Sequence, residues 1–323
     1  LPLAHERGLV FYDQLDSGRS DSPGDPANWT LERFVSEIDG VRDALGLREL
    51  HLLGHSWGAT LANIYASRQP PGLRSLILQG PNLSARSWEA SVKRWLPLLP
   101  QGLGATMEAH ERASTLQHPD YLAARAAFER AHVMRAPAPP WMDAYRRLVP
   151  KNHGAQLYQA MIGGSEIYTG GLLAGFDHEP LLEQIEAPTL VLCGEYDEMS
   201  PVECARLAGK LARGRLAVIP GAAHMAQYDN PCAWRAVIAA FIAEPDHVAD
   251  LARSHSGVDA RLAETLRLST AGADHALANH WTRLTFRHRE QFVRLQARDG
   301  DVEVDAIEQR AADALGVAST GCR

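Results

Sequence analysis

The sequence has few of the features that point to a large or charged partner. Its net charge of −7 over 323 residues argues against nucleic acid or an anionic membrane surface as the main partner. No apolar run reaches the roughly 18 residues that a membrane-spanning helix needs. The four cysteines show neither CxxC nor ladder spacing, so we expect free thiols in a reducing, cytoplasmic compartment. No His, Cys and Glu cluster has metal-ligand spacing and no glycine-rich phosphate loop follows a strand, so we expect neither metal nor cofactor.

Strand and helix patterns alternate on both sides of a helical middle. Short apolar runs predict buried strands at residues 9–12, 50–54, 73–78, 189–193 and 215–219. Apolar residues at helical spacing predict a helix over 31–45, with Thr30 as its cap and Gly46 at its end. Further helices are expected over 59–67 and 234–242. This alternation indicates an α/β fold with a mostly parallel sheet covered on both faces.

Two segments interrupt or follow that pattern. Residues 84–181 are rich in Trp, Arg, Ala and Pro and read as helices, for example 119–134 and 140–148. We therefore expect a core in two parts, a helical cap and a helical extension of unknown role. In chain order, the first part of the core covers residues 1–83, the cap covers 84–181, the second part of the core covers 182–244 and the extension covers 245–323.

One motif between a strand and a helix carries chemistry. Residues 54–58 read Gly-His-Ser-Trp-Gly, which matches G-x-S-x-G and makes Ser56 the candidate nucleophile. The flanking glycines allow a sharp turn that exposes the Ser oxygen, and the following helix start favours developing negative charge. In this position the motif predicts a serine hydrolase of the α/β-hydrolase fold. Because residue 56 is Ser, the Asp-nucleophile chemistry of the same fold is excluded.

A Ser nucleophile needs a base, and the base needs a group that orients it. In this fold the order along the chain is Ser, acid, His. Asp197 and His224 follow the ends of two predicted strands, where open α/β sheets bind their ligands. We predict that His224 takes the Ser56 proton and returns it to the leaving group. Asp197 would hold the imidazole tautomer and stabilise the imidazolium.

Several further stretches resemble the proline iminopeptidases (prolyl aminopeptidases). Residues 11–14 with 17–20, FYDQ and SGRS, are similar to the FYDQxGxGRS stretch of that family. Residues 194–198, GEYDE, resemble the tricorn-interacting branch, and 161–166, MIGGSE, resemble its M-x-G-x-x-E-F cap motif with Ile167 in place of Phe. The resemblance covers roughly residues 5–244, and the motifs occur in the family's order.

The resemblance implies roles for further residues. In that family, acidic side chains from the cap and beside the catalytic Asp bind the free α-amino group, which here implies Glu166 and Glu198. Such a pair would reject internal peptide segments, because buried carboxylates left unpaired are costly. The backbone N–H of Trp57 is implied as an oxyanion donor. Trp57 and Tyr158 are candidates for an apolar slot that takes a proline ring, although aromatic residues more often pack a core.

The sequence departs from the family pattern in three places. Asp16 stands where the family usually has Gly, which we expect to alter only a turn. Residues 245–323 match no known part of the family. The HGGPG loop, which supplies a second oxyanion donor, does not occur before residue 11, and loss of one donor costs on the order of 10²–10³ in rate. We therefore hypothesise that the sequence is a piece of a longer protein; a natively sourced protein of 35.3 kDa would contradict this.

The function that these observations favour is a serine aminopeptidase. It would release N-terminal proline, or a similar small residue, from short peptides or amides through an acyl-enzyme. One alternative is an esterase or amidase acting on an aminoacylated secondary metabolite, and another is a non-catalytic binding protein with the same fold. The expected partner is a small peptide or amino-acid amide, with no nucleic acid and no membrane. The sequence leaves the oligomeric state open.

Overall fold

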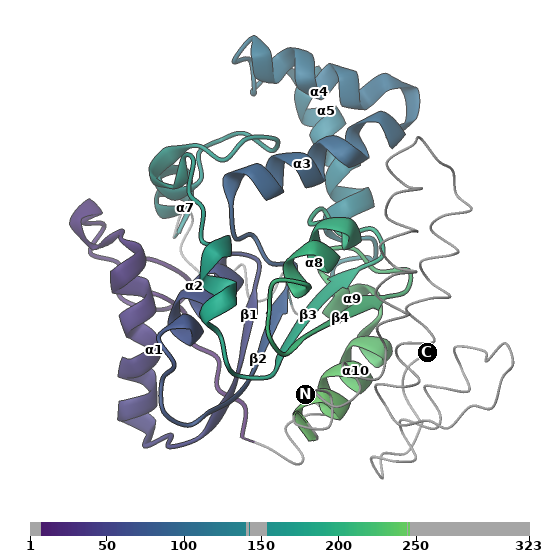
Figure 1. Ribbon diagram of the computed structural model, residues 1–323. Coiled ribbons are helices and arrows are strands. Elements are labelled where there is room, and N and C mark those ends of the chain that lie inside the picture. Colours follow the sequence, from purple (N-terminus) through teal and green to yellow (C-terminus); the bar gives the residue numbers. More distant parts are fainter. Residues whose placement is uncertain (1–7, 140–141, 143–153, 244, 246–323) are drawn as a thin grey trace, which may run out of the picture.

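The centre of the molecule is a parallel sheet (Figure 1). This computed structural model describes residues 8–139, 142, 154–243 and 245. The sheet has four strands in the spatial order β1-β2-β3-β4, and they comprise β1 (Leu50–His55), β2 (Leu73–Gln79), β3 (Thr189–Gly194) and β4 (Gly214–Ile219). All neighbouring pairs are parallel, which confirms the predicted class.

Helices flank the sheet and form the region above it in Figure 1. In chain order they are α1 (Leu31–Leu45), α2 (Trp57–Ser67), α3 (Ala85–Trp95), α4 (Leu103–Arg112), α5 (Pro119–Phe128), α7 (Ala155–Met161), α8 (Pro201–Ala208), α9 (Ala226–Asp229) and α10 (Pro231–Ala243). Successive strand residues pack on opposite faces of the sheet. In β2, Leu76 and Leu78 join a cluster with α2 and α8, whereas Ile77 joins a cluster with α10. Apolar side chains on both faces explain why these strands read as continuous apolar runs.

Local signals set the limits of α1 as predicted. The Thr30 hydroxyl accepts a hydrogen bond from the backbone N–H of Arg33 at 3.2 Å, which satisfies one of the open donors of the first turn. Gly46 ends the helix in the left-handed conformation, with φ 63°. The apolar stripe is buried at Phe34 and Ile38, but its last member, Leu45, is 54% exposed. The stripe therefore anchors the first three turns and not the last.

The predicted strand at residues 9–12 is wrong. No strand is assigned there, and Phe11 is 78% exposed. A strand requires a neighbour that takes up its backbone hydrogen bonds. Among the described residues, β1 is the outermost strand and pairs only with β2. The apolar pattern of residues 9–12 thus marks β propensity, which becomes a strand only when a partner lies beside it.

The region between β2 and β3 has its own small core. Residues of α3, α4 and α5, together with Ile167, form an apolar cluster that includes Val92, Met107, Tyr121 and Phe128. The chain enters and leaves this region at one point, because the His178 N–H donates to the Leu83 carbonyl at 2.8 Å. We call residues 84–181 the cap. The predicted helix over 140–148 and the predicted extension over 245–323 lie outside the described residues, except for residues 142 and 245.

Two further predictions concern cysteine and membranes. Cys193 and Cys204 are buried free thiols, and burial raises the pKa of both. Cys232 is disulfide-bonded, so the expectation of four free thiols is wrong at that position. Within the described part of the chain, every helix is too short or too polar to cross a membrane.

Candidate active site

Ser56 lies in the tight turn that joins β1 to α2. Its backbone has φ 54° and ψ −116°, a conformation that non-glycine residues seldom adopt unless their surroundings impose it. A Cβ on Gly54 would lie 2.2 Å from the Gly58 carbonyl oxygen, so strand and helix could not approach this closely with any other residue. A Cβ on Gly58 would meet nothing within 4 Å. Of the two flanking glycines, the packing therefore requires only the first.

Asp197 and His224 come together from the loops that follow β3 and β4. His224 Nδ1 lies 2.8 Å from Asp197 Oδ1, and both residues are buried. The Asp197 carboxylate also accepts the backbone N–H groups of Met199 at 2.9 Å and Gly194 at 3.3 Å. Because an ionised carboxylate can only accept, His224 donates from Nδ1, and its Nε2 is left to act on other groups. Asp197 therefore sets the tautomer of His224.

The other ring nitrogen of His224 lies near a second carboxylate. Nε2 is 3.4 Å from Oε1 of Glu198. Burial by itself would lower the pKa of His224, but the negative charges of Asp197 and Glu198 raise it above its usual value. Burial raises the pKa of Glu198, and the positive charge of His224 opposes that rise. Each of the two groups thus favours the charged form of the other, and the imidazole acts as a base only when its Nε2 carries no proton.

A cavity of about 760 Å³ brings the predicted site residues together. Six of the seven line it: Ser56, Trp57, Tyr158, Glu166, Glu198 and His224. The seventh, Asp197, is completely buried and reaches the cavity only through its bond to His224. The core supplies the nucleophile and the base, while the cap supplies Glu166 and Tyr158. A ligand in this cavity would touch both regions.

The two glutamates in the cavity differ in their partners. Glu198 is 5% exposed, and its Oε2 has no hydrogen-bond partner among the described residues. Glu166 Oε2 lies 2.9 Å from Nε of Arg125, which also contacts Glu129 at 2.9 Å. Burial raises the pKa of Glu166 to about 7, against the opposing charge of Arg125. The cavity thus holds two acidic side chains whose charged forms burial disfavours, and, in the part of the chain that the structure describes, only Glu166 is paired with an arginine.

The two aromatic candidates are held to different degrees. Trp57 donates from Nε1 to Oε1 of Gln14 at 3.1 Å, and its ring meets Phe34 edge-on at 6.1 Å between centroids. Its backbone N–H is at the first residue of α2, where helix N–H groups point out of the helix. Tyr158 on α7 is 56% exposed. Trp57 is therefore a fixed part of the cavity wall, whereas Tyr158 has room to move at its rim.

Two residues beside His224 were not anticipated from the sequence. His55 bonds through Nε2 to the His224 carbonyl at 3.0 Å, and the two rings are 4.5 Å apart between centroids. Burial, and then the charge of His224, lower the pKa of His55 to about 3, so it stays neutral. A Cβ on Gly80 would lie 2.6 Å from the His224 ring. The only sequence signal for these two residues is their position at the ends of β1 and β2.

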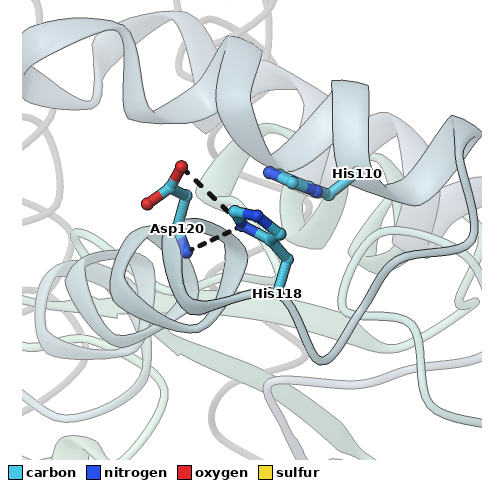
Figure 2. Close-up of side chains that lie close together, drawn as sticks. All are labelled: His110, His118 and Asp120. Carbon is cyan, nitrogen blue, oxygen red and sulfur yellow. Dashed lines mark hydrogen bonds and ion pairs between the residues drawn. The ribbon is translucent and has the colours of Figure 1, made fainter.

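A second cluster of titratable side chains lies in the cap, outside the cavity (Figure 2). One ligand atom each of His110, His118 and Asp120 lie within 4.8 Å of one another. The two imidazoles stack at 4.5 Å with 22° between their planes, so their lone pairs lie in nearly parallel planes and do not converge on one ion. His118 Nδ1 accepts the Asp120 N–H at 3.2 Å, a contact that caps α5. Helix capping and ring stacking account for this cluster.

The fold and the site define the class of protein. The alpha/beta hydrolase fold family matches residues 2–231, and the chain belongs to it. A proline iminopeptidase of Heyndrickxia coagulans is 36% identical over 74% of this chain and 83% of its own length. The proline iminopeptidase of Levilactobacillus brevis is 33% identical over 77% of this chain and 83% of its own length. Within the fold family, the chain therefore belongs to the proline iminopeptidases, which confirms the resemblance seen in its motifs.

Solved structures agree with this assignment. The crystal structure of the Mycobacterium smegmatis proline iminopeptidase is 34% identical and superposes with a TM-score of 0.63, over 70% of this chain and 75% of that one. The crystal structure of VinJ is 28% identical, also with a TM-score of 0.63, over 70% and 76%. Both matches cover more than two thirds of each chain, so the likeness includes the core and is not limited to one motif.

Proposed function

We propose that this chain is a serine aminopeptidase that releases N-terminal proline, or a similar small residue, from short peptides or amides. The carrying observation is the pair of a half-buried Glu166 and a buried Glu198, which line the same cavity as Ser56 and His224. A buried carboxylate oxygen without a partner, as in Glu198, is costly unless a cation arrives to pair with it. A substrate's ammonium group supplies that cation and three N–H donors.

Four of the predicted residues carry the bond-making and bond-breaking steps: Ser56, His224, Asp197 and Trp57. Ser56 Oγ attacks the first carbonyl carbon while His224 Nε2 accepts the Ser56 proton, and Trp57 N–H donates to the developing oxyanion. The C–N bond then breaks as His224 returns the proton to the leaving amine, which leaves a prolyl ester on Ser56. Water, deprotonated by His224, attacks this ester, and the proton returns to Ser56 as the amino acid leaves. Asp197 stabilises the imidazolium throughout.

The ammonium group also contributes to activating the base. Because the charge of Glu198 helps to raise the pKa of His224, a cation bound at Glu198 offsets that charge and lowers the pKa of the imidazole. His224 is then free to lose its proton and act on Ser56. An N-acylated substrate has no such cation, so it would meet a protonated base and an unpaired carboxylate. Selection for a free N-terminus thus follows from the same contact that prepares catalysis.

Three substrates test this proposal. We expect hydrolysis of a prolyl arylamide, little hydrolysis of its N-acetyl analogue, and none of either by Ser56→Ala. A 4-nitrophenyl acyl ester without an amine gives the comparison for an esterase. Ester hydrolysis that is indifferent to an amine would contradict the aminopeptidase. Silence on all three substrates, with no labelling of Ser56 by a fluorophosphonate, would favour a binding protein.

The size of the cavity favours a second candidate, an amidase or esterase for an aminoacylated secondary metabolite. About 760 Å³ lies in the range of pockets that enclose a whole small molecule, and a prolyl residue fills only part of it. Prolyl amides and esters with leaving groups of increasing size would separate the two. A kcat/KM that rises with the leaving group favours the metabolite substrate. A constant value favours peptides, whose recognition ends at the first residue.

A further inference from the structure

The two loops that carry Asp197 and His224 are fastened to the end of the α5 helix in the cap. After α5 the chain makes one π-helical turn, Glu129–Val133. The carbonyl groups of its last residues accept no hydrogen bond from within the helix. The His132 carbonyl accepts both the Glu198 N–H at 3.0 Å and the His224 N–H at 3.2 Å. One cap residue therefore fixes the backbone of a candidate amine-binding residue and of the candidate base.

The side chain of His132 adds a third contact to the same loops. Its Nδ1 lies 2.9 Å from the Tyr196 carbonyl, which can only accept, so His132 carries its proton on Nδ1. The ring stacks on Trp95 at 4.6 Å between centroids and lies 5.0 Å from Phe128. Burial lowers the pKa of His132 to about 4, so it is neutral at pH 7. Any influence on His224 then comes from position and not from charge.

On the other side, Asp229 holds the same stretch of cap to the His224 loop. Its Oδ1 accepts the backbone N–H groups of Arg135 at 2.9 Å and Ala136 at 2.7 Å. Its Oδ2 accepts the N–H of Ala223 at 2.8 Å, next to His224 in the chain. A carboxylate that receives three backbone donors from two segments fixes their spacing, and charge-assisted bonds of this kind are about twice as strong as neutral ones.

We propose that residues 132–136, which we call the post-α5 segment, set the position of both catalytic loops, and that His132 within it and Asp229 opposite it are the positioning residues. The inference rests on the proposed function, because it concerns alignment of the groups that would carry the reaction. The cap is then more than a cover for the cavity. It completes the catalytic centre, since the loops of Glu198 and His224 each donate a backbone hydrogen bond to it.

The two residues differ in what they position. The backbone carbonyl of His132 accepts from both loops and is kept in any variant, whereas its side chain holds the Tyr196 carbonyl in the loop of Asp197 and Glu198. Loss of the side chain would therefore displace that loop first, and with it amine recognition and the partner of His224. Among the residues that the structure describes, the Asp229 carboxylate accepts hydrogen bonds only from the His224 loop and the post-α5 segment, so its loss disturbs alignment alone. Displacements of about 1 Å in such groups lower rates by as much as about 10²-fold. A purely structural role would lower stability in both cases without this difference in pattern.

The first test uses His132→Phe, which keeps the aromatic stack and removes the Nδ1 donor. We expect kcat/KM for a prolyl arylamide to fall about tenfold to a hundredfold, with a smaller preference for the free amine over its N-acetyl analogue. His132→Asn restores an N–H donor near the position of Nδ1. We expect it to recover much of the kcat/KM and much of the preference for the free amine. His110→Phe, the same change at a cap histidine outside the cavity that keeps the ring stacked on His118, is the control. Equal effects of the two Phe variants, or no rescue by Asn, would overturn the role of His132.

The second test uses Asp229→Asn and Asp229→Ala, with Asp43→Ala on the exposed face of α1 as control. We expect kcat to fall at least tenfold while the preference for the free amine is kept. The rate at which a fluorophosphonate labels Ser56 should fall in parallel, and this readout needs no prolyl substrate. Labelling that slows in an enzyme unable to cleave prolyl substrates would refute the proposed function and retain the positioning role. Labelling at the wild-type rate in both Asp229 variants would refute the positioning role.

Discussion

Two groups of buried carboxylates in this chain have opposite surroundings. Glu179, where the cap rejoins the core, is 1% exposed and surrounded by donors. Glu198, in the cavity, is 5% exposed and has one oxygen without a partner among the described residues. Both are as buried as apolar core residues, so burial alone does not distinguish them. What differs is how the protein compensates the charge, and that difference separates a structural acid from one available to a ligand.

The Glu179 carboxylate is fully occupied. Arg206 binds it through both terminal nitrogens at 2.7 Å, and Lys210 donates at 2.8 Å. Ser84 and Ser87, at the start of the cap, donate to Oε1. Burial would raise the pKa of Glu179, but these donors hold it well below its usual range. The network joins the start and end of the cap to α8, so its charge stabilises the fold.

In the cavity the balance is reversed. Burial raises the pKa values of Glu166 and Glu198, and Arg125 and His224 only partly oppose it. Such an arrangement destabilises the empty protein and becomes favourable when a cation binds. The comparison therefore predicts opposite effects for the same isosteric change, Glu to Gln, at the two places.

The largest expected effect is on activity. Glu198→Gln removes the charge that we assign to the ammonium group, so kcat/KM for a prolyl arylamide should fall on the order of 10²–10³-fold. The kcat/KM for the N-acetyl analogue should change little, because this substrate has no ammonium group to pair with Glu198. Steady-state kinetics on the two substrates measure the ratio. Glu179→Gln is the matched control and should keep the wild-type ratio; a similar loss in that variant would remove the distinction between the two acids.

The next effect is on stability at Glu179. Glu179→Gln places an amide NH₂ against donors from Arg206, Lys210 and two serines, and it leaves the cations without their partner. We expect the free energy of unfolding at pH 7 to fall by about 3 kcal/mol, the lower end for breaking a buried pair, since both cations reach water. Because the pKa of Glu179 is lowered on folding, this contribution is present above the usual carboxyl pKa and is lost in strong acid. Urea unfolding at pH 7 and pH 3 measures it.

A smaller effect of opposite sign is expected at Glu166. Its pKa rises from 4.5 to about 7 on folding, so the native state binds a proton that the unfolded chain has released. Stability therefore falls as pH rises through this window, and the penalty is complete above it. Glu166→Gln should be more stable than wild type by about 1 kcal/mol at pH 8 and equal to it at pH 4. If Glu166→Gln were less stable than wild type at pH 8, the ion pair with Arg125 would stabilise the native state more than burial of the carboxylate destabilises it.

Features that depend on near neighbours in the chain were predictable. The cap of α1 at Thr30, its end at Gly46 and the turn at Ser56 each arise from a residue whose chemistry acts within a few positions. The four strands were predicted correctly because a strand that is buried on both faces has a continuous run of apolar residues in its sequence. Residues 9–12 carry a similar run and form no strand, because pairing is a property of the neighbour and not of the run itself.

Contacts across long sequence separations were not predictable. Nothing local to Arg125 indicates that it pairs with Glu166, and nothing local to His132 indicates that it holds the loops of two strands. Asp16 shows the same limit. It adopts φ 60°, which suits the Gly usual in the family, and is accommodated because its carboxylate accepts bonds from residues 22, 24 and 29. The expectation of an altered turn did not include this compensation.

The smallest effect is on the pH dependence of the base, and it tests the electrostatic coupling between Glu198 and His224 directly. The anions of Asp197 and Glu198 raise the pKa of His224, so removing one of them lowers it. Glu198→Gln should move the acid limb of kcat/KM for a 4-nitrophenyl acyl ester to lower pH by about one unit, because His224 loses its proton earlier. An ester without an amine keeps ammonium binding out of the measurement. Glu179→Gln should leave the limb in place. An unmoved limb in Glu198→Gln would mean that Asp197 alone sets the pKa of His224, and that Glu198 acts on the substrate without acting on the base.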